Sequence, residues 1–159
     1  VYANLEHERE QDNDMPAPIT QNAYEHSTRW QNNNYDPVAD GFVRDDTPQN
    51  DIREIFRKGW TASEKGANIT FEVEGSCLAV QYRKSVVQPT PIAKAIVDGD
   101  EEHAMLLDGN FEETWGDSLH LDTLAEHLPY GKHTVRIELI ETHEDDKVPF
   151  YLVSVIASH

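Results

Sequence analysis

Two runs near the end of the sequence constrain the fold most strongly. From Thr134 to Ile140 apolar and polar residues alternate, which is the period of a strand with one face in a core. The run Phe150 to Ala157 is apolar on both faces, as is typical of a strand in the middle of a sandwich. The charged, proline-containing segment from His143 to Pro149 predicts a loop between them. We therefore expect an antiparallel pair of strands that closes an all-β domain.

Four more strands are predicted upstream, at Asn68–Glu74, Cys77–Lys84, Ile92–Val97 and His103–Leu107. We expect the first two to form a hairpin through Gly75-Ser76, and the last two to reverse tightly at Asp98-Gly99. The long segment from Asn110 to Tyr130 is interpreted as a loop. Weaker patterns suggest a short strand at Gly41–Arg44 and a helical turn or irregular edge at Asp51–Trp60. This spacing predicts a jelly-roll-like antiparallel sandwich.

The first forty residues differ in character from the rest. Val1 to Glu10 fits a short polar helix, which the prolines of Met15-Pro-Ala-Pro18 would end. The segment from Ile19 to Asp40 is rich in Asn and Gln but holds three large aromatic residues. We interpret it as an irregular arm that packs on something. The expected organisation is a connector over residues 1–40 and a sandwich over residues 41–159.

Composition excludes several functions. The net charge of -17 repels phosphate backbones and anionic membranes, so neither nucleic acid nor a membrane is an expected partner. No apolar run approaches the roughly 20 residues of a membrane span, and no signal peptide is visible. The only cysteine, Cys77, is expected to be a small buried side chain, and a lone cysteine favours a reducing compartment.

The string Gly116-Asp117-Ser118-Leu119 matches the motif after which the GDSL esterases are named. That chemistry needs the serine at a turn between a buried strand and a helix, beside backbone donors for an oxyanion. A polar segment precedes Ser118 here, so we do not expect it to be a nucleophile. The pair Asp100 and His103 has the spacing of an acid and base, but it precedes the serine, in the opposite order to the esterases.

Metal chemistry has only weak support. The second half of the chain holds no HxxxH or HxH pair of histidines. The acidic clusters at residues 98–102 and 143–146 lack the ligand spacing of a known calcium loop. We expect no metal and no cofactor, with calcium at one of these turns as a minority alternative.

Aromatic residues at strand ends and in loops are the remaining signal. A flat aromatic ring beside polar groups suits the C–H face and hydroxyls of a sugar. Trp60 follows Gly59 just before the core begins and is expected to be buried, whereas Trp115 stands in a long polar segment.

Three runs resemble a known family: GWTASEKGANITFEVEGSCLAVQYRKS, IAKAIVDGDEEHAMLLDGNFEETWGDSLHL and KHTVRIELIETHEDDKVPFYLVSVIAS. They are similar to the β-sandwich accessory domain joined to the C-terminal side of bacterial SGNH (GDSL-type) hydrolases, over Gly59 to Ser158. The resemblance implies an accessory module whose catalytic motifs lie in a preceding domain. It also implies that the arm is a connector after that domain.

Two functional hypotheses follow. In the first, the module recognises an acetylated glycan, with Tyr82 and Trp115 as stacking platforms and Arg83, Asp117 and His120 as hydroxyl partners. In the second, it is structural and packs on the catalytic domain or on a second subunit, in a homo-oligomer. A free-standing esterase that uses Ser118 is the least favoured alternative.

Overall fold

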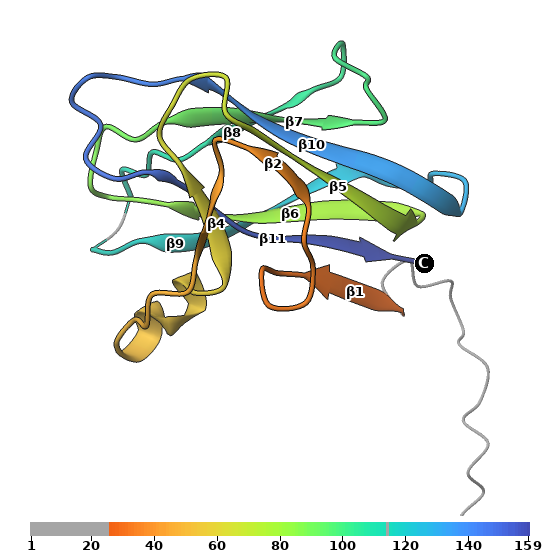
Figure 1. Ribbon diagram of the computed structural model, residues 1–159, viewed down its shortest axis with the longest axis horizontal. Coiled ribbons are helices and arrows are strands. Elements are labelled where there is room, and N and C mark those ends of the chain that lie inside the picture. Colours follow the sequence, from red (N-terminus) through yellow and green to blue (C-terminus); the bar gives the residue numbers. More distant parts are fainter. Residues whose placement is uncertain (1–25, 114) are drawn as a thin grey trace, which may run out of the picture.

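The computed structural model describes residues 26–113 and 115–159 and forms a sandwich of two antiparallel sheets (Figure 1). Sheet A has the order β3-β4-β11-β6-β9, with β1 beside β11, and sheet B has the order β2-β5-β10-β7-β8. The strands of sheet A are β1 (Ser27–Trp30), β3 (Val43–Asp45), β4 (Gly59–Ala62), β6 (Cys77–Lys84), β9 (Ser118–Ala125) and β11 (Phe150–Ser158). Those of sheet B are β2 (Val38–Asp40), β5 (Asn68–Gly75), β7 (Ile92–Val97), β8 (Met105–Asp108) and β10 (Gly131–Glu141). The predicted all-β sandwich is confirmed.

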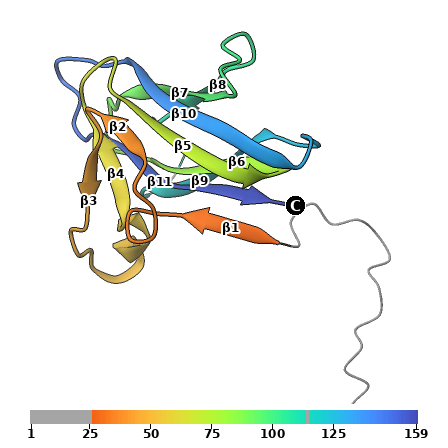
Figure 2. The same cartoon turned by 45° about the vertical axis from the view of Figure 1, so that its right-hand side comes forward.

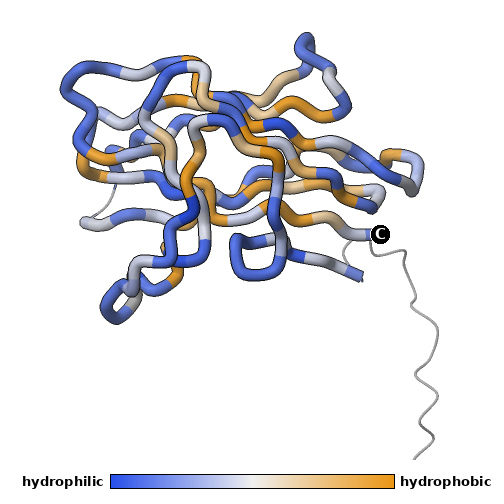
Figure 3. Tube along the Cα trace, viewed as in Figure 1, coloured by the Kyte–Doolittle hydropathy of each residue, from blue (hydrophilic) through white to orange (hydrophobic). Residues whose placement is uncertain are grey.

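The core lies between the two sheets and is built from alternate residues of their strands. Figure 3 shows this alternation of hydrophobic and hydrophilic positions along the chain. Ile69 and Phe71 of β5 and Val135, Ile137 and Leu139 of β10 are fully buried, and so are Leu78 and Val80 of β6. Burying one such side chain stabilises the fold by about 1.5–3 kcal/mol.

Strand β11 lies inside sheet A and is buried on both faces, as its apolar run predicts. Its inner residues Leu152 and Val155 belong to the core between the sheets. On its outer face, Tyr151 and Val153 pack with Phe56 of the 3-10 helix η1 (Asp51–Phe56). The predicted helical turn at this place is therefore present, and it covers part of the outer face of sheet A. Within the described residues, no helix is long and apolar enough to cross a membrane.

Two predicted strand pairs are wrong, although their strands are present. Strands β5 and β6 do not form a hairpin, because β5 pairs with β10 and β2 while β6 pairs with β11 and β9. Strands β10 and β11 likewise lie in different sheets. Alternation fixes which face of a strand is buried but not its hydrogen-bonded neighbour. Each connection instead carries the chain across the core.

The pairing of β7 with β8 in sheet B is confirmed, but the reversal is not tight, because residues 98–104 connect the two strands. Strand β9, however, lies inside the segment interpreted as a loop. In this strand, His120 pairs with Tyr82 of β6, and Asp122 pairs with Val80. His120 and Asp122 are two residues apart, so they lie on the same face of β9. These two polar residues interrupt the apolar pattern by which a strand is recognised.

The sandwich begins before the predicted boundary at residue 41. Strand β1 pairs with β11 and β2 pairs with β5, so both belong to the sheets, as Figure 2 shows. The aromatic residues Trp30 and Tyr35 pack against the core, and the Tyr35 ring stacks on Phe71 with their centroids 5.7 Å apart. Within residues 26–40 the predicted packing is confirmed, whereas the irregular structure that we expected is in part replaced by β1 and β2. The predicted helix at Val1–Glu10 lies outside the described residues.

Gly59 provides a test of how tightly β4 approaches β11. A Cβ atom at this position would overlap the carbonyl oxygen of Leu152 and the ring of Tyr151. We predict that Gly59→Ala lowers the free energy of unfolding by about 1–3 kcal/mol, as overpacking does. In the control Gly131→Ala, the added Cβ would lie 4.0 Å from its nearest neighbour, the Pro129 carbonyl oxygen. Urea unfolding measures both, and equal effects would contradict the close approach.

An ion pair joins the turn that follows β7 to the beginning of β10. The Nδ1 atom of His133 lies 2.7 Å from Asp98 Oδ2, and its Nε2 lies 3.0 Å from the Pro129 carbonyl oxygen. Both partners are acceptors, so the doubly protonated imidazolium satisfies both. The hydrogen bond to Asp98 raises the pKa of His133 above its ordinary value. Burial alone would raise the pKa of Asp98, but hydrogen bonds from Thr134 and His133 hold it below its usual range.

These shifts predict a pH-dependent stability. A raised histidine pKa contributes stability that is fully present below the unfolded pKa of about 6.5 and is lost as pH rises through the folded pKa. The lowered pKa of Asp98 contributes above its unfolded value of about 3.9. His133→Gln should therefore cost about 1 kcal/mol between roughly pH 4 and pH 6.5 and less at higher pH.

The measurement is the urea midpoint of variant and parent across this range. The control is His127→Asn, at an exposed turn position with φ 59°, a geometry that asparagine tolerates. A His133→Gln effect that does not change with pH would rule out the ion pair as its cause.

Candidate functional site

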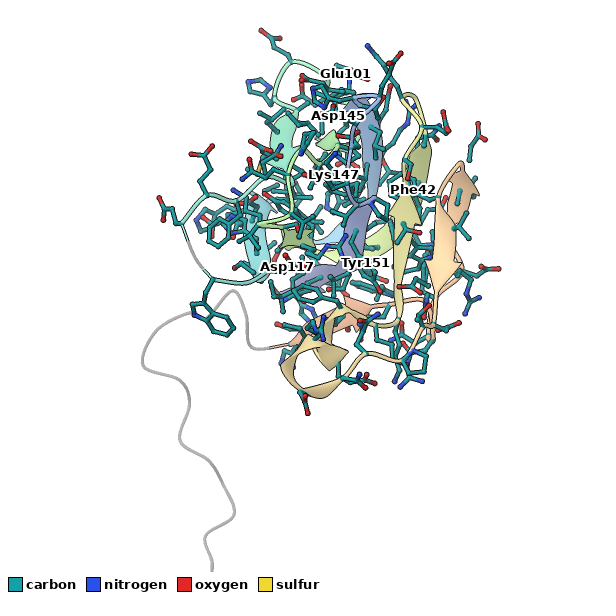
Figure 4. All side chains as sticks on the ribbon, turned by 90° about the vertical axis from the view of Figure 1, so that its left-hand side faces the viewer. Phe42, Glu101, Asp117, Asp145, Lys147 and Tyr151 are labelled. Carbon is teal, nitrogen blue, oxygen red and sulfur yellow. The ribbon has the colours of Figure 1, made fainter. Side chains whose placement is uncertain are left out.

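A groove of about 630 Å³ lies on the η1 side of sheet A. It is enclosed by η1, by the loop between β6 and β7 (residues 85–91), and by the loop between β8 and β9 (residues 109–117). Figure 4 shows Asp117 and Tyr151 on this side of the molecule, near η1, while Glu101 lies on the side of sheet B. The lining residues are Arg53, Ile55, Phe56, Val86, Val87, Phe111, Trp115, Gly116, Asp117, Ser118 and Leu119. This volume is typical of small-molecule sites.

The groove is mainly apolar. Ile55 comes from η1, Val87 from the β6–β7 loop, and Phe111 and Trp115 from the β8–β9 loop. The Trp115 side chain is 88% exposed, so its indole faces solvent at the mouth of the groove. An exposed tryptophan beside an apolar hollow is a feature of binding sites rather than of cores.

The Asp117 carboxylate ties the two loops together. Its Oδ1 accepts hydrogen bonds from the Ser85 hydroxyl at 2.8 Å and from the Val86 backbone N–H at 3.2 Å. The Ser85 hydroxyl oxygen in turn accepts from the Val87 N–H at 3.1 Å. Asp117 therefore holds the two loops together, and because it also lines the groove its predicted role as a hydroxyl partner of a ligand stays a prediction.

Backbone and amide hydrogen bonds complete this connection. The Ser85 N–H donates to the Gly109 carbonyl at 2.7 Å, and the Phe111 N–H donates to the Ser85 carbonyl at 3.0 Å. The Gln88 side-chain amide donates to the Phe111 carbonyl at 2.9 Å. The walls carrying Val87 and Trp115 are thus parts of one hydrogen-bonded unit.

Arg83 lies behind the groove and does not line it. Its Nε is 3.9 Å from Asp117 Oδ2, and its guanidinium donates to the Pro149 carbonyl at 3.0 Å. The guanidinium carbon lies 5.4 Å from the centre of the Tyr151 ring, a cation–π contact. Burial lowers the pKa of Arg83 from its ordinary value. Arg83 is engaged within the protein, which leaves its predicted role as a hydroxyl partner without a geometric basis.

Tyr82 and His120 lie on the inner side of sheet A, away from the groove. Tyr82 is 1% exposed, its ring stacks on Phe150, and its hydroxyl donates to Asp122 at 3.0 Å. The predicted role of Tyr82 as a stacking platform is therefore wrong, because a ligand cannot reach its ring. Burial, with the charge of Asp122, raises the pKa of the Tyr82 hydroxyl well above its ordinary value. His120 Nε2 lies 3.3 Å from Asp122 Oδ1, so His120 also serves this inner contact.

Ser118 lacks the setting of a nucleophile. It is the first residue of β9 and pairs with Lys84 in sheet A, not at a turn between a strand and a helix. Ser118, His120 and Asp122 alternate along β9, yet in the described part of the chain no hydrogen bond joins the Ser118 and His120 side chains. The geometry offers no activated serine.

The acidic residues of the two turns at 98–102 and 143–146 contact other side chains of the protein. Asp98 accepts from Thr134 and pairs with His133, Asp100 pairs with His103, and Asp146 pairs with His143. Among residues 26–113 and 115–159, no three metal-ligating side chains gather into a site. The two turns thus hold their own loops together.

Comparison with known proteins shows which class of fold the chain has. No family model matches the chain, and no curated protein matches it. A family 35 carbohydrate-binding module from Clostridium thermocellum matches 84% of the chain and 99% of its own, with 14% identity and a TM-score of 0.52. A family two carbohydrate esterase from Cellvibrio japonicus matches 84% of the chain and 33% of its own, with 16% identity and a TM-score of 0.53. These similarities show a β-sandwich fold shared with carbohydrate-binding modules.

A much closer similarity is to a two-domain esterase active on acetylated mannans, crystallised with mannopentaose. The identity is 58% and the TM-score 0.86, over 91% of this chain and 39% of the esterase. The chain is therefore an accessory β-sandwich domain of the kind found in this two-domain carbohydrate esterase, as the sequence resemblance implied. It spans well under half the length of that protein.

The connection made by Asp117 can be tested by removing its carboxylate. Asp117→Ala deletes the acceptor for the Ser85 hydroxyl and the Val86 N–H, and it leaves Arg83 without its carboxylate. We predict a loss of about 1–3 kcal/mol in the free energy of unfolding, and a smaller loss for Asp117→Asn, which keeps an acceptor oxygen. Urea unfolding provides the measurement.

The control for Asp117 is Asp36→Ala. Asp36 is 89% exposed and lies 3.8 Å from Arg44, so its removal should change stability by less than about 0.5 kcal/mol. Equal losses at Asp117 and Asp36 would contradict the structural role of Asp117.

Proposed function

We propose that this domain is a non-catalytic accessory module of a carbohydrate esterase, and that its groove holds acetylated glycan beside the attached catalytic domain. The observation that carries the proposal is the 88% exposed Trp115 at the mouth of an apolar groove of about 630 Å³. A flat indole offers its face to the C–H side of a sugar ring.

The rigidity of the groove supports this role. Asp117, Ser85 and Gln88 fix the loops that carry Val87 and Trp115. A wall that is ordered before binding loses less conformational entropy when a ligand arrives. Weak contacts to a flexible polysaccharide can then give measurable affinity.

The substrate class is suggested by the similar two-domain esterase, which is described as active on acetylated mannans. This chain matches 39% of that protein, so we assign the ester hydrolysis to a separate domain, covalently joined and preceding this one. In this proposal, Ser118 takes no part in the reaction. Residues 1–25, whose structure is not described, would belong to the connection between the domains.

A structural role is the second candidate. Ile55 and Val87 are each 48% exposed beside the groove, and a contact with another domain or subunit would cover them. In that case the groove would contribute a wall to the neighbouring site instead of binding glycan by itself.

Replacement of Trp115 separates the two candidates. Calorimetric titration with acetylated mannan oligosaccharides should show binding that Trp115→Ala weakens at least about tenfold, because the stacking surface is lost. The control is Tyr130→Ala, which removes a 59% exposed aromatic residue from the turn between β9 and β10. Tyr130 lies far along the strands from the groove, so the control should bind as the parent does.

The opposite results are equally informative. Equal affinity of the Trp115→Ala and Tyr130→Ala variants would exclude Trp115 as the platform. If the parent binds none of these oligosaccharides, glycan recognition by this groove is refuted. The structural candidate would then predict that deleting the domain from the two-domain protein reduces its turnover of small soluble esters.

A further inference from the structure

We infer that the groove distinguishes acetylated glycan from the same glycan without its acetyl groups, through the apolar side chains beside Trp115. This inference rests on the proposed glycan recognition and adds the chemical group that is recognised. It would make the module a receptor for the substrate of an esterase rather than for the deacetylated product.

The walls of the groove are largely apolar. Ile55, Val87 and Phe111 come from three different segments and converge on the hollow that Trp115 borders. A sugar that carries free hydroxyls loses water on binding and needs hydrogen-bond partners in return. An acetyl methyl group needs none, and it gains free energy when an apolar wall covers it.

The polar groups near the groove are largely occupied by contacts within the protein. Asp117 Oδ1 accepts two hydrogen bonds, and its Oδ2 is directed to Arg83. The hydroxyl of Ser85 is 1% exposed and both donates and accepts within the loop. A free sugar hydroxyl, which must donate its proton, thus finds few acceptors among these side chains.

The remaining lining donors complement an ester. In the described residues, the side chains of Arg53 and Ser118 line the groove, and no protein group is bonded to their donors. Arg53 can only donate, and the Ser118 hydroxyl can donate. An acetyl ester presents a carbonyl oxygen that only accepts, next to its methyl group. The groove therefore offers donors and apolar surface, the two features that an acetyl group requires.

The size of the expected effect follows from one methyl group. Burial of a methylene-sized group contributes about 0.8 kcal/mol, which corresponds to about a fourfold change in the dissociation constant. Loss of the carbonyl acceptor would add to this. Deacetylation should therefore weaken binding at least about fourfold.

The experiment compares two forms of one ligand. The chain is titrated calorimetrically with an acetylated mannan oligosaccharide and with the same oligosaccharide after mild alkaline deacetylation. Tighter binding of the acetylated form, by about fourfold or more, supports the inference. Equal binding of both forms overturns the inference and leaves the proposed glycan recognition intact. If neither form binds, both are overturned.

A substitution in the wall assigns the effect to the groove. Val87→Thr keeps the shape of the side chain and replaces a methyl group with a hydroxyl, and Val87 is 48% exposed, so the fold should tolerate it. We expect weaker binding of the acetylated form and a ratio between the two forms that falls towards one. The matched control is Val38→Thr, at an 80% exposed position of β2 in sheet B, which should leave the ratio unchanged.

Ile55→Thr provides a second variant on the opposite wall. It should lower the ratio in the same way, since Ile55 also lines the groove and is 48% exposed. Urea midpoints close to that of the parent would show that both variants fold. A ratio that neither variant changes would overturn the assignment of acetyl recognition to these side chains.

Discussion

The structure depends on the burial of β11 from both sides. Its inner residues, such as Leu152, join the core between the sheets, and its outer residues Tyr151 and Val153 need a separate cover. Phe56 of η1 provides that cover on the outer face of sheet A. Because Phe56 holds η1 against the outer face of sheet A, the preceding residue, Ile55, forms part of one wall of the groove. The same packing that completes the fold therefore positions the candidate site.

Most of the strands could be predicted from the sequence, but their neighbours could not. Alternation from Ile69 to Val73 and from Val135 to Leu139 marks two faces that must be buried, and β5 and β10 form there. Nothing in that pattern says that these two strands pair with each other across the intervening residues 76–130, because register and partner are set by the whole assembly. Strand β9 was missed for a different reason. His120 and Asp122 replace apolar residues on its inner side, and their contacts with Tyr82 satisfy them there.

In the candidate site, too, some residues could be selected from the sequence, and others could be recognised only from the folded structure. Trp115 could be selected because a large aromatic residue in a polar segment is unusual, and its side chain is indeed exposed. Tyr82 could have been excluded, since it shares a strand face with Leu78 and Val80, two apolar residues that are fully buried in the core. The role of Asp117 was not accessible, because it depends on the approach of Ser85 from a loop 32 residues earlier. Val87 and Ile55 had no signal in the sequence at all, being isolated apolar residues of the kind found on any protein surface.

The strong acidity of the chain bears on the kind of glycan that the proposed function requires. A net charge of -17 repels polyanions such as glycans rich in carboxylates, although it has no such effect on a neutral mannan chain. Around the groove itself, the Asp117 carboxylate is paired with Ser85 and lies near Arg83, so it offers little charge to a ligand. Under the proposed function, long-range charge would select against acidic polymers, while the short-range contacts of Trp115 and its apolar neighbours would act on an uncharged one. An esterase that works on acetylated, uncharged glycan would gain from both effects, since the first limits unproductive binding and the second retains the substrate.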